Sequence, residues 1–375
     1  MAGPYASLSA EDAEQLKREG EQTLLNFGTS FHPELVTSAT GSYIATSSGH
    51  RILDWTSGQI SCLIGHGNPE IVKTITEHAE SLDHLFSPMV SSLVVNLAKR
   101  LTSLLPEGLD KALFLSTGQC PESNEAAIRL AKLYTGKFEI IGLRSGWHGM
   151  TSDANAATYH SRGPGYGPMT PGSFMFASPN AYRSIFRNAD GSHDWRTELD
   201  YGFSLIDQQT VGSLAAVIVE PILSSAGMHP LPHGYLKVLK RHCELRNMLL
   251  IVDEAQTAIG RSGDMFGFQH DGDGVVPDMA ALGMSIIGDP ITKAAAPELG
   301  AAIAGKMTAL GIWAQIATLP SFGGTFRIAP PLTVTEKELE MGLEIMERAQ
   351  AGTPGTMPLY GNEKGGLGIV KGWKL

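Results

Sequence analysis

The sequence predicts an α/β protein, with a mostly parallel sheet flanked by helices and a smaller C-terminal α+β domain. Between residues 213 and 255, an apolar run (SLAAVIVEPI), a segment with helical spacing (GYLKVLKRHCELRN) and a second apolar run (MLLIVDEA) follow one another. Strand, helix and strand in this order form the βαβ unit of a parallel sheet. The 375 residues allow two domains and a large core, and the 43 glycines indicate many tight turns.

The other elements follow from periodicity and from cap and turn residues. Ser9 and Asp12 mark the start of the first helix, and Gly28 marks its end. Weak alternation with turn signals predicts a hairpin that leads to Trp55. In chain order we expect a helix over 10–28, a hairpin over 41–55, helices over 68–82 and 94–105, a short buried strand over 111–118, a helix over 121–136, a buried strand over 138–143 and a long loop over 161–180.

The texture of the chain changes after residue 282, where a strand, a helix and a second strand (FRIAPPLTV) are expected before a tail without periodicity. We therefore expect four parts. They are an N-terminal helix and hairpin segment over 1–50, a large domain over 51–282, a small domain over 283–350 and an irregular tail over 351–375.

Composition argues against several classes of function. The formal net charge is −10 and there is no block of lysine or arginine, which argues against nucleic acid or an anionic membrane as the main partner. The three cysteines are far apart and match no metal-binding spacing, which indicates a reducing, cytoplasmic compartment. The N-terminus lacks the apolar core of a secretory signal, and no apolar run is long enough to span a membrane.

Two loops carry residues with a possible role in chemistry. Thr117 and Gly118 stand in a strand–turn–helix segment, where the free N–H groups of a helix start suit a phosphate, although many such turns are simple connections. Trp147 lies in a glycine-flanked loop, SGWHGM, and either covers the edge of the core or stacks on a flat ring. The neighbouring His148 alone does not indicate a metal site.

Asp253 is the most informative residue, because it ends an apolar strand and a buried carboxylate is costly unless it is paired. It either caps the next segment or pairs with a protonated heterocyclic nitrogen. Glu220 ends the preceding predicted strand in the same way. Ligands of parallel sheets bind beyond the carboxyl ends of the strands, so we expect Thr117, Trp147 and Asp253 to converge on one cleft there.

These segments together resemble the class III (fold-type I) pyridoxal-phosphate aminotransferases, and among them most of all the 2,2-dialkylglycine decarboxylases. The motifs that carry the resemblance are DWTSGQ, STG with ESNEAAIR, SGWHGM, EPILSS, VDEAQTAIGRSG and FRIAPPLTV. They occur in the family's order over residues 20 to 282 and resume to about residue 345. The resemblance implies the PLP-transferase fold and pyridoxal 5′-phosphate (PLP) as cofactor.

The resemblance also implies roles for single residues. Thr117 and Gly118 would hold the cofactor phosphate, Trp147 would stack on the pyridine ring, Asp253 would pair with the ring nitrogen and Gln256 would contact the phenolic oxygen.

Around the substrate, Gln59 and Ser225 would face carboxylates, and Arg327 would clamp the retained carboxylate, unless it forms a surface ion pair. Leu85 and Ser87 match part of an alkali-metal site. The family pattern further implies a homodimer that binds small amino acids and keto acids.

The chain departs from the family where the Schiff-base lysine is expected. PDMAAL, residues 277–282, begins the family's lysine segment, but a simple alignment then places Met284 at the lysine position. The following residues resemble the start of the small domain, which indicates a junction near Leu282 with a long segment absent. Lys293 belongs to the small domain by its pattern. The TGQCPESNE turn also carries two residues more than the family turn.

Three interpretations follow. The first is a PLP enzyme that decarboxylates a 2,2-dialkylglycine and transfers its amino group to a keto acid, with another class III aminotransferase activity as a variant of it. The second is a catalytically inactive relative, which binds the cofactor weakly or pairs with a full-length subunit. The third is a spliced product that lacks the lysine and folds poorly alone, because a parallel sheet that is cut in its middle exposes an edge and apolar surface.

Overall fold

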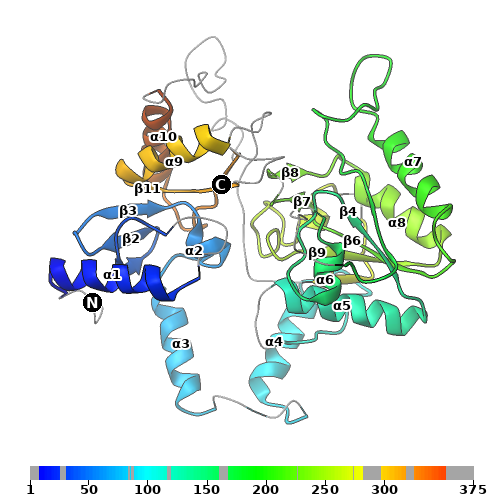
Figure 1. The fold of residues 1–375 in the computed structure, drawn as a ribbon. Coiled ribbons are helices and arrows are strands. Elements are labelled where there is room, and N and C mark those ends of the chain that lie inside the picture. The colour runs from blue at the N-terminus through cyan, green and yellow to red at the C-terminus, as the bar shows by residue number, and fades with distance from the viewer. Residues whose placement is uncertain are drawn as a thin grey trace. The chain divides into compact units, whose positions relative to one another are not determined.

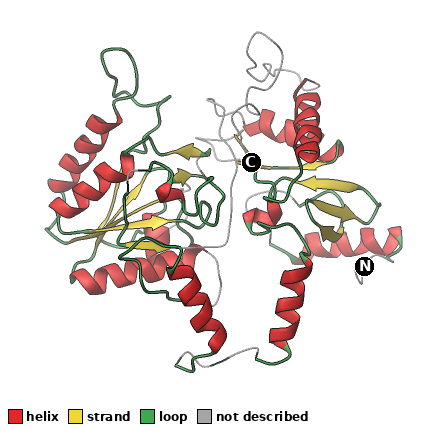
Figure 2. Cartoon of the chain, turned by 180° about the vertical axis from the view of Figure 1, so that it is seen from behind, coloured by secondary structure: helices red, strands yellow, loops and turns green. Residues whose placement is uncertain are grey.

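The structure is a computed structural model (Figures 1 and 2). It describes residues 8–25, 31–82, 85, 88–115, 120–159, 168–225, 227–272, 274–281, 297–317 and 325–351. Backbone contacts divide the chain into two compact units. The terminal unit comprises residues 1–58, 64–68 and 294–375, and the central unit comprises residues 59–63 and 69–293. The N-terminal and C-terminal parts of the chain thus share one unit, whereas the boundaries expected from the sequence separate them.

The central unit contains a five-stranded sheet in which every neighbouring pair of strands is parallel. Its order is β10 (Met279–Ala281), β9 (Leu249–Asp253), β6 (Leu214–Val219), β4 (Glu139–Leu143) and β5 (Ser173–Phe176). All six residues of β6 are buried, as expected for a strand that is covered on both faces. The predicted α/β fold with a parallel sheet is therefore confirmed.

Helices cover both faces of this sheet because neighbouring residues of a strand point to opposite sides (Figure 2). Val217 and Val219 of β6 belong to a core cluster with α7 (Trp195–Asp207) and α8 (Tyr235–Leu245). Ile218 belongs to a second cluster on the other face, with α5 (Cys120–Thr135) and α6 (Ser152–Ala157). The sheet is thus the middle layer of three, and its strand ends are held from both sides.

The smaller elements of the central unit precede and follow this sheet. They are α3 (Pro69–Ala79), α4 (Ser92–Thr102), the two-stranded pair β7 (Ile222–Leu223) and β8 (His229–Pro230), and the 3-10 turn η1 (Gly267–Gln269).

The terminal unit is built on a sheet of order β1–β2–β3–β11. The strands β1 (Val36–Thr40), β2 (Tyr43–Thr46) and β3 (Arg51–Asp54) are antiparallel, and β11 (Ile312–Trp313) joins β3 in parallel. Trp55 and Leu53 pack with residues of α9 (Pro297–Ala309) and α10 (Glu336–Ala351) in one core. The remaining elements of this unit are α1 (Ala10–Thr23) and the hairpin β12 (Gln315–Ala317)–β13 (Thr325–Arg327); α2 (Ser57–Ile60) spans the boundary between the units.

Most expected elements are present. The hairpin before Trp55 is β2–β3, and the helices expected over 68–82, 94–105 and 121–136 are α3, α4 and α5. Ser9 caps α1 by accepting a hydrogen bond from the Asp12 N–H at 3.1 Å, but the helix ends at Thr23, before the predicted Gly28. The strand expected after residue 282 and the tail after residue 351 lie outside the described residues.

Two predictions in the central unit were wrong. Residues 111–115 form no strand, and Leu113, Phe114 and Leu115 are exposed. A buried parallel strand needs a hydrogen-bonded neighbour, and the described sheet provides none for this apolar run. The loop expected over 161–180 contains β5, which forms one edge of the sheet.

The close packing of α10 against Trp55 predicts that a larger residue at Gly342 lowers stability. A Cβ atom at Gly342 would lie 2.0 Å from Trp55 Cζ2, and Trp55 is buried. Gly342→Ala should therefore lower the free energy of unfolding by about 1–3 kcal/mol through overpacking. Urea denaturation of the full chain measures this.

The matched control is Gly305→Ala in α9, where the added Cβ meets no atom within 4 Å. This substitution should leave stability unchanged or raise it by up to about 1 kcal/mol, because alanine favours a helix more than glycine does. Equal effects of the two substitutions would contradict the packing argument.

Candidate active site

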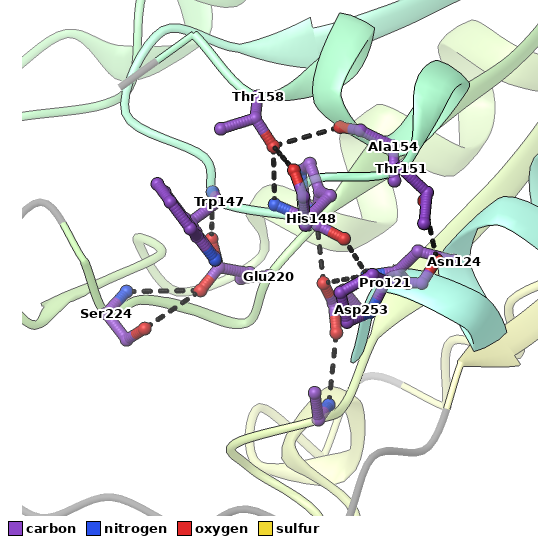
Figure 3. Close-up of polar contacts among 12 residues, drawn as sticks. Pro121, Asn124, Trp147, His148, Thr151, Ala154, Thr158, Glu220, Ser224 and Asp253 are labelled. Atoms are coloured by element: carbon purple, nitrogen blue, oxygen red, sulfur yellow. Dashed lines mark hydrogen bonds and ion pairs between the residues drawn. The ribbon is translucent and has the colours of Figure 1, made fainter. Parts of the chain in front are cut away.

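Four of the residues that the sequence analysis singled out lie at one edge of the sheet of the central unit. Asp253 is the last residue of β9, Glu220 follows β6, and Trp147 and His148 follow β4. These three strands are neighbours and run parallel, so their carboxyl ends meet (Figure 3). The prediction that Asp253 lies at the carboxyl end of an interior strand is confirmed.

The carboxylate of Asp253 is buried, with 3% exposure, and is held by three donors. Asn124 Nδ2 donates to Oδ2 at 2.7 Å, and His148 Nδ1 contacts the same oxygen at 2.9 Å. The Ala255 N–H donates to Oδ1 at 3.1 Å. The carboxylate is therefore fixed in position, and it accepts fewer hydrogen bonds than the roughly four that its two oxygens allow.

Asn124 is a site residue that the sequence reasoning missed. It lies in α5, is fully buried, and its Nδ2 also donates to the backbone oxygen of His148 at 2.9 Å. This amide thus connects the helix to the β4 loop and to Asp253 (Figure 3). The only signal in the sequence is an asparagine among the apolar residues of the helix face, three positions after Pro121.

His148 is held through its backbone and through its ring. Its backbone N–H donates to Thr158 Oγ1 at 2.8 Å. Its ring lies against Gly146, because a Cβ atom added to Gly146 would come within 2.8 Å of His148 Nε2. Because an ionised carboxylate only accepts, Nδ1 carries the proton that is shared with Asp253. Neither His148 Nε2 nor Asn124 Oδ1 has a hydrogen-bond partner in the described part of the chain, although both atoms are buried.

Glu220 is a second buried carboxyl beside Asp253. Its Oε1 accepts from the Trp147 N–H at 2.8 Å, and its Oε2 accepts from the N–H and the hydroxyl of Ser224, both at 3.2 Å. Burial raises the pKa of Glu220 to about 7; the charge of Asp253 raises it too, while His148 and the hydrogen bonds lower it. Glu220 therefore keeps its proton to a higher pH than an ordinary glutamate does.

These features fit the ring of a pyridoxal cofactor. A protonated ring nitrogen supplies the charged donor that a buried carboxylate requires, and Asp253 has acceptor capacity left for it. His148 Nε2 and Asn124 Oδ1 are buried beside this carboxylate, and their hydrogen-bonding capacity is not satisfied in the described part of the chain.

The structure places the other predicted residues of the central unit less closely. Trp147, Gln256 and Ser225 are half-buried. Trp147 and Gln256 lie in the loops that follow β4 and β9, and Ser225 follows β7. Leu85 is half-buried, whereas its expected partner Ser87 lies outside the described residues, as do Thr117, Gly118, Met284 and Lys293. The convergence of Thr117 with Trp147 and Asp253 thus stays a prediction.

Arg327 belongs to the terminal unit, where it pairs with Gln315 across the β12–β13 hairpin, and its side chain is outside the description.

Gln59 is exposed and lies in α2, whose four residues all have positive φ. The values are 47° for Ser57, 58° for Gly58, 70° for Gln59 and 71° for Ile60. Three of the four are not glycine, and the left-handed conformation costs each of them about 1–2 kcal/mol. Such strain persists only where the surroundings determine it, and it is common at functional sites.

The described residues contain no cluster of three or more histidine, cysteine, aspartate or glutamate side chains that could hold a metal ion. No described helix has the length and apolar character needed to cross a membrane.

Comparison with known proteins agrees with this geometry. The family described as aminotransferase class-III matches residues 28–298. The chain belongs to aminotransferase class III. This is a family of PLP-dependent transaminases, so the cofactor expected from the sequence is the cofactor of the family.

Among related sequences, an uncharacterized aminotransferase of Schizosaccharomyces pombe is 36% identical over 440 residues, covering 93% of this class III chain and 97% of the relative. The acetylornithine aminotransferase of Bifidobacterium longum is 32% identical over 300 residues and covers 75% of the chain. The chain spans 65% of the length of that second relative.

Solved structures of transaminases share the fold. An (S)-enantioselective omega-transaminase from Thermomicrobium roseum aligns with a TM-score of 0.77 at 21% identity, over 90% of this chain and 98% of its own. A Bacillus anthracis aminotransferase aligns with a TM-score of 0.79 at 18% identity, over 92% of this chain and 99% of its own. These likenesses confirm the PLP-transferase fold.

The pKa of Glu220 predicts a pH dependence of stability. In the unfolded chain this carboxyl loses its proton near its ordinary pKa of 4.5, whereas the folded chain keeps it up to about pH 7. Its contribution to stability is fully present below pH 4.5 and is lost as the pH rises to 7, by on the order of 3 kcal/mol. In Glu220→Gln this loss should be absent.

Urea denaturation of both proteins between pH 4.5 and 8 measures the difference. The difference in free energy of unfolding, Glu220→Gln minus the unsubstituted chain, should become more positive as the pH rises across this window. This holds even if the substitution lowers stability at every pH. Two curves that stay parallel would refute the assignment of the buried proton to Glu220.

Proposed function

We propose that this class III chain binds PLP at the carboxyl ends of β4, β6 and β9, and that its reaction is the decarboxylation and transamination of a 2,2-dialkylglycine. The amino group would pass to a small keto acid. The observation that carries the proposal is the buried Asp253 carboxylate, which Asn124 and His148 hold with an acceptor position left for a ring nitrogen.

Each residue of the site has a proposed task. When bound, PLP supplies an electron-poor ring that stabilises the charge left on the substrate α-carbon after a bond to it breaks. Asp253 would keep the ring nitrogen protonated, and Asn124 and His148 would fix the orientation of its carboxylate. Trp147 would cover one face of the ring and exclude water, and Gln256 would contact the phenolic oxygen.

Thr117 and Gly118 would hold the phosphate at the start of α5, where free N–H groups favour an anion.

The preference for a dialkylglycine rests on Gln59, Ser225 and Arg327, as the resemblance assigns them. Gln59 would contact the carboxylate that leaves as carbon dioxide, and Arg327 would clamp the other carboxylate with its two parallel N–H donors. A second candidate is transamination of an acetylornithine-type substrate, which the Bifidobacterium longum relative favours. The affinities of the PLP-loaded chain for 2-aminoisobutyrate and for N-acetylornithine, followed by the absorbance of the cofactor, distinguish the two without requiring turnover.

We further propose that the chain lacks the Schiff-base lysine and binds PLP without a covalent bond. The alignment with the Schizosaccharomyces pombe relative extends over 440 residues, whereas the chain has 375, so at least 65 positions of that relative have no counterpart. This supports the absence of an internal segment near Leu282. A positioned lysine amine both speeds exchange with the substrate amine and moves a proton, so its absence makes turnover slow.

A homodimer is the proposed assembly. The described helices α3 and α4 have no buried residues, although Val72 and Ile75 of α3 and Val94 and Leu97 of α4 are apolar and about half exposed. Apolar helix faces of this kind usually lie in an interface. The second copy of the chain is the proposed occupant, and light scattering of the full chain measures the molar mass that decides it.

The cofactor proposal predicts that Asp253→Asn weakens PLP binding. The substitution removes the negative charge that pairs with the ring nitrogen, and a hydrogen bond to a buried charge is worth about 1.5–3 kcal/mol, or about 10- to 100-fold in affinity. Equilibrium dialysis with PLP measures the dissociation constants.

Asp278→Asn is the matched control. Asp278 accepts from the Leu250 N–H at 2.8 Å near the start of β9 and pairs with Lys240, so it lies at the opposite end of the same strand. Its substitution should leave PLP affinity unchanged. Equal PLP affinity of Asp253→Asn and the unsubstituted chain would refute the cofactor proposal.

The missing lysine makes a separate prediction. After PLP loading and borohydride reduction, acid should release all of the cofactor from the chain, as the free alcohol that borohydride forms from its aldehyde. Carbon dioxide release from 2-aminoisobutyrate should stay at or near background. Positioned acid–base groups of this kind typically contribute about 10²–10⁴-fold in rate. Mass spectrometry of the reduced chain detects any covalent adduct.

A stoichiometric pyridoxyl adduct on a lysine, most tellingly on Lys293, together with steady carbon dioxide release, would show that the chain is a complete enzyme.

A further inference from the structure

The left-handed turn α2, which presents Gln59, is held by a buried carboxylate. Asp54 has 2% exposure and accepts four hydrogen bonds. Its Oδ1 accepts from the N–H of Thr56 at 2.8 Å and from the Thr56 hydroxyl at 2.6 Å. Its Oδ2 accepts at 2.7 Å from the N–H of Gly58, the residue just before Gln59. One side chain thus fixes both the entry to the turn and its second residue.

His66 completes this arrangement from the far end of the segment. Its Nε2 lies 2.8 Å from Asp54 Oδ2, and its side chain is mostly buried. The backbone of His66 forms two hydrogen bonds with Gly41, at 2.8 and 2.9 Å, in the β1–β2 turn. Asp54 and His66, twelve positions apart, therefore close a loop around the turn and connect it to the sheet of the terminal unit.

Two further contacts connect this segment with later parts of the terminal unit. Ser57 is fully buried, and its hydroxyl donates to the backbone oxygen of Ala329. The Trp55 N–H donates to the Trp313 oxygen at 3.0 Å, in β11. Ser57 and Ile60 are buried and Gln59 is exposed, so the turn directs one amide side chain outward.

The hydrogen bonds also keep Asp54 ionised. Burial alone would raise its pKa, but the donors His66, Thr56 and Gly58 outweigh burial and lower the pKa below its ordinary value. An ionised carboxylate is the stronger acceptor for the Gly58 N–H. The Asp54 carboxylate is thus in its most effective charge state as an acceptor at neutral pH.

We propose that Asp54 and His66 are positioning residues for substrate recognition: they hold α2 in its left-handed conformation and so place the Gln59 amide where it meets a substrate carboxylate. This inference rests on the proposed function, which gives Gln59 that contact. Neither Asp54 nor His66 touches the substrate, and both act through Gln59.

The test measures the affinity of the PLP-loaded full chain for 2-aminoisobutyrate, followed by the absorbance of the cofactor. In Asp54→Asn one of the two acceptor oxygens becomes an NH2 donor, so the side chain can no longer accept from both Thr56 and Gly58. The affinity for 2-aminoisobutyrate should fall by about tenfold, while the dissociation constant for PLP stays unchanged. His66→Phe removes one donor and should act in the same direction with a smaller effect.

A double-substitution cycle separates positioning from a general structural role. If Asp54 acts through Gln59, Asp54→Asn should cause no further loss of 2-aminoisobutyrate affinity in a Gln59→Ala background. Additive losses would overturn the inference, as would unchanged affinity in Asp54→Asn alone.

Glu34→Gln is the matched control. Glu34 forms a comparable pair with His50, at 2.9 Å, on the exposed side of the same hairpin. Its substitution should change neither the affinity for 2-aminoisobutyrate nor the affinity for PLP.

A separate measurement distinguishes failure of the inference from failure of the proposed function. Backbone amide chemical shifts of residues 57–60 should change in Asp54→Asn and stay constant in Glu34→Gln, whether or not a ligand binds. If the unsubstituted chain binds no 2-aminoisobutyrate, the proposed function falls, and these shifts still decide whether Asp54 determines the turn. If the shifts stay constant in Asp54→Asn, the positioning role is refuted.

Discussion

A carboxylate can be buried only when hydrogen-bond donors compensate for the water that it loses, and Asp253 imposes this requirement on the carboxyl edge of the central sheet. The donors come from three separate parts of the chain: Asn124 from α5, His148 from the loop after β4, and the Ala255 N–H from the turn after β9. Each donor is itself held in place, as Asn124 shows by bonding the His148 backbone. The helix, the loop and the strand therefore have to pack in one arrangement, and that arrangement creates the site.

Local patterns predicted much of this. The order of apolar and amphipathic segments gave the βαβ unit, and the acids that end two apolar runs marked the functional edge of the sheet. Asn124 was missed because its partners lie 24 and 129 residues away, which periodicity along one helix does not reveal. The left-handed turn α2 was missed for a similar reason: only one of its four residues is glycine, and the force that holds it comes from Asp54 and His66.

The wrong predictions have one cause. An apolar run such as Leu113–Leu115 is compatible with a buried strand. A buried strand also needs a neighbouring strand to pair with, and whether one is present depends on the whole sheet. β5 is the converse case, since a segment rich in turn residues became a strand because β4 offered it an edge. The N-terminal and C-terminal parts form one unit because β11 pairs with β3, more than 250 residues earlier in the sequence. Local signals for domain boundaries do not predict such a distant pairing.

Asp253 and Glu220 place two acids side by side at the carboxyl edge of the sheet. Asp253 and Glu220 are both buried and both face His148, so two negative charges there would repel each other in a medium that screens them poorly. The two acids differ in their donors. Asp253 accepts from a histidine, a side-chain amide and a backbone N–H, whereas Glu220 accepts from two backbone N–H groups and a hydroxyl. Burial, helped by the charge of Asp253, raises the pKa of Glu220 to about 7, so this acid carries only part of a negative charge at neutral pH. Partial protonation of Glu220 reduces the repulsion between the two acids, whereas a positively charged pyridine nitrogen would compensate the charge of Asp253 directly. The cost of burying a charge, which made Asp253 recognisable in the sequence, therefore acts on Glu220 as well and is met there by a proton.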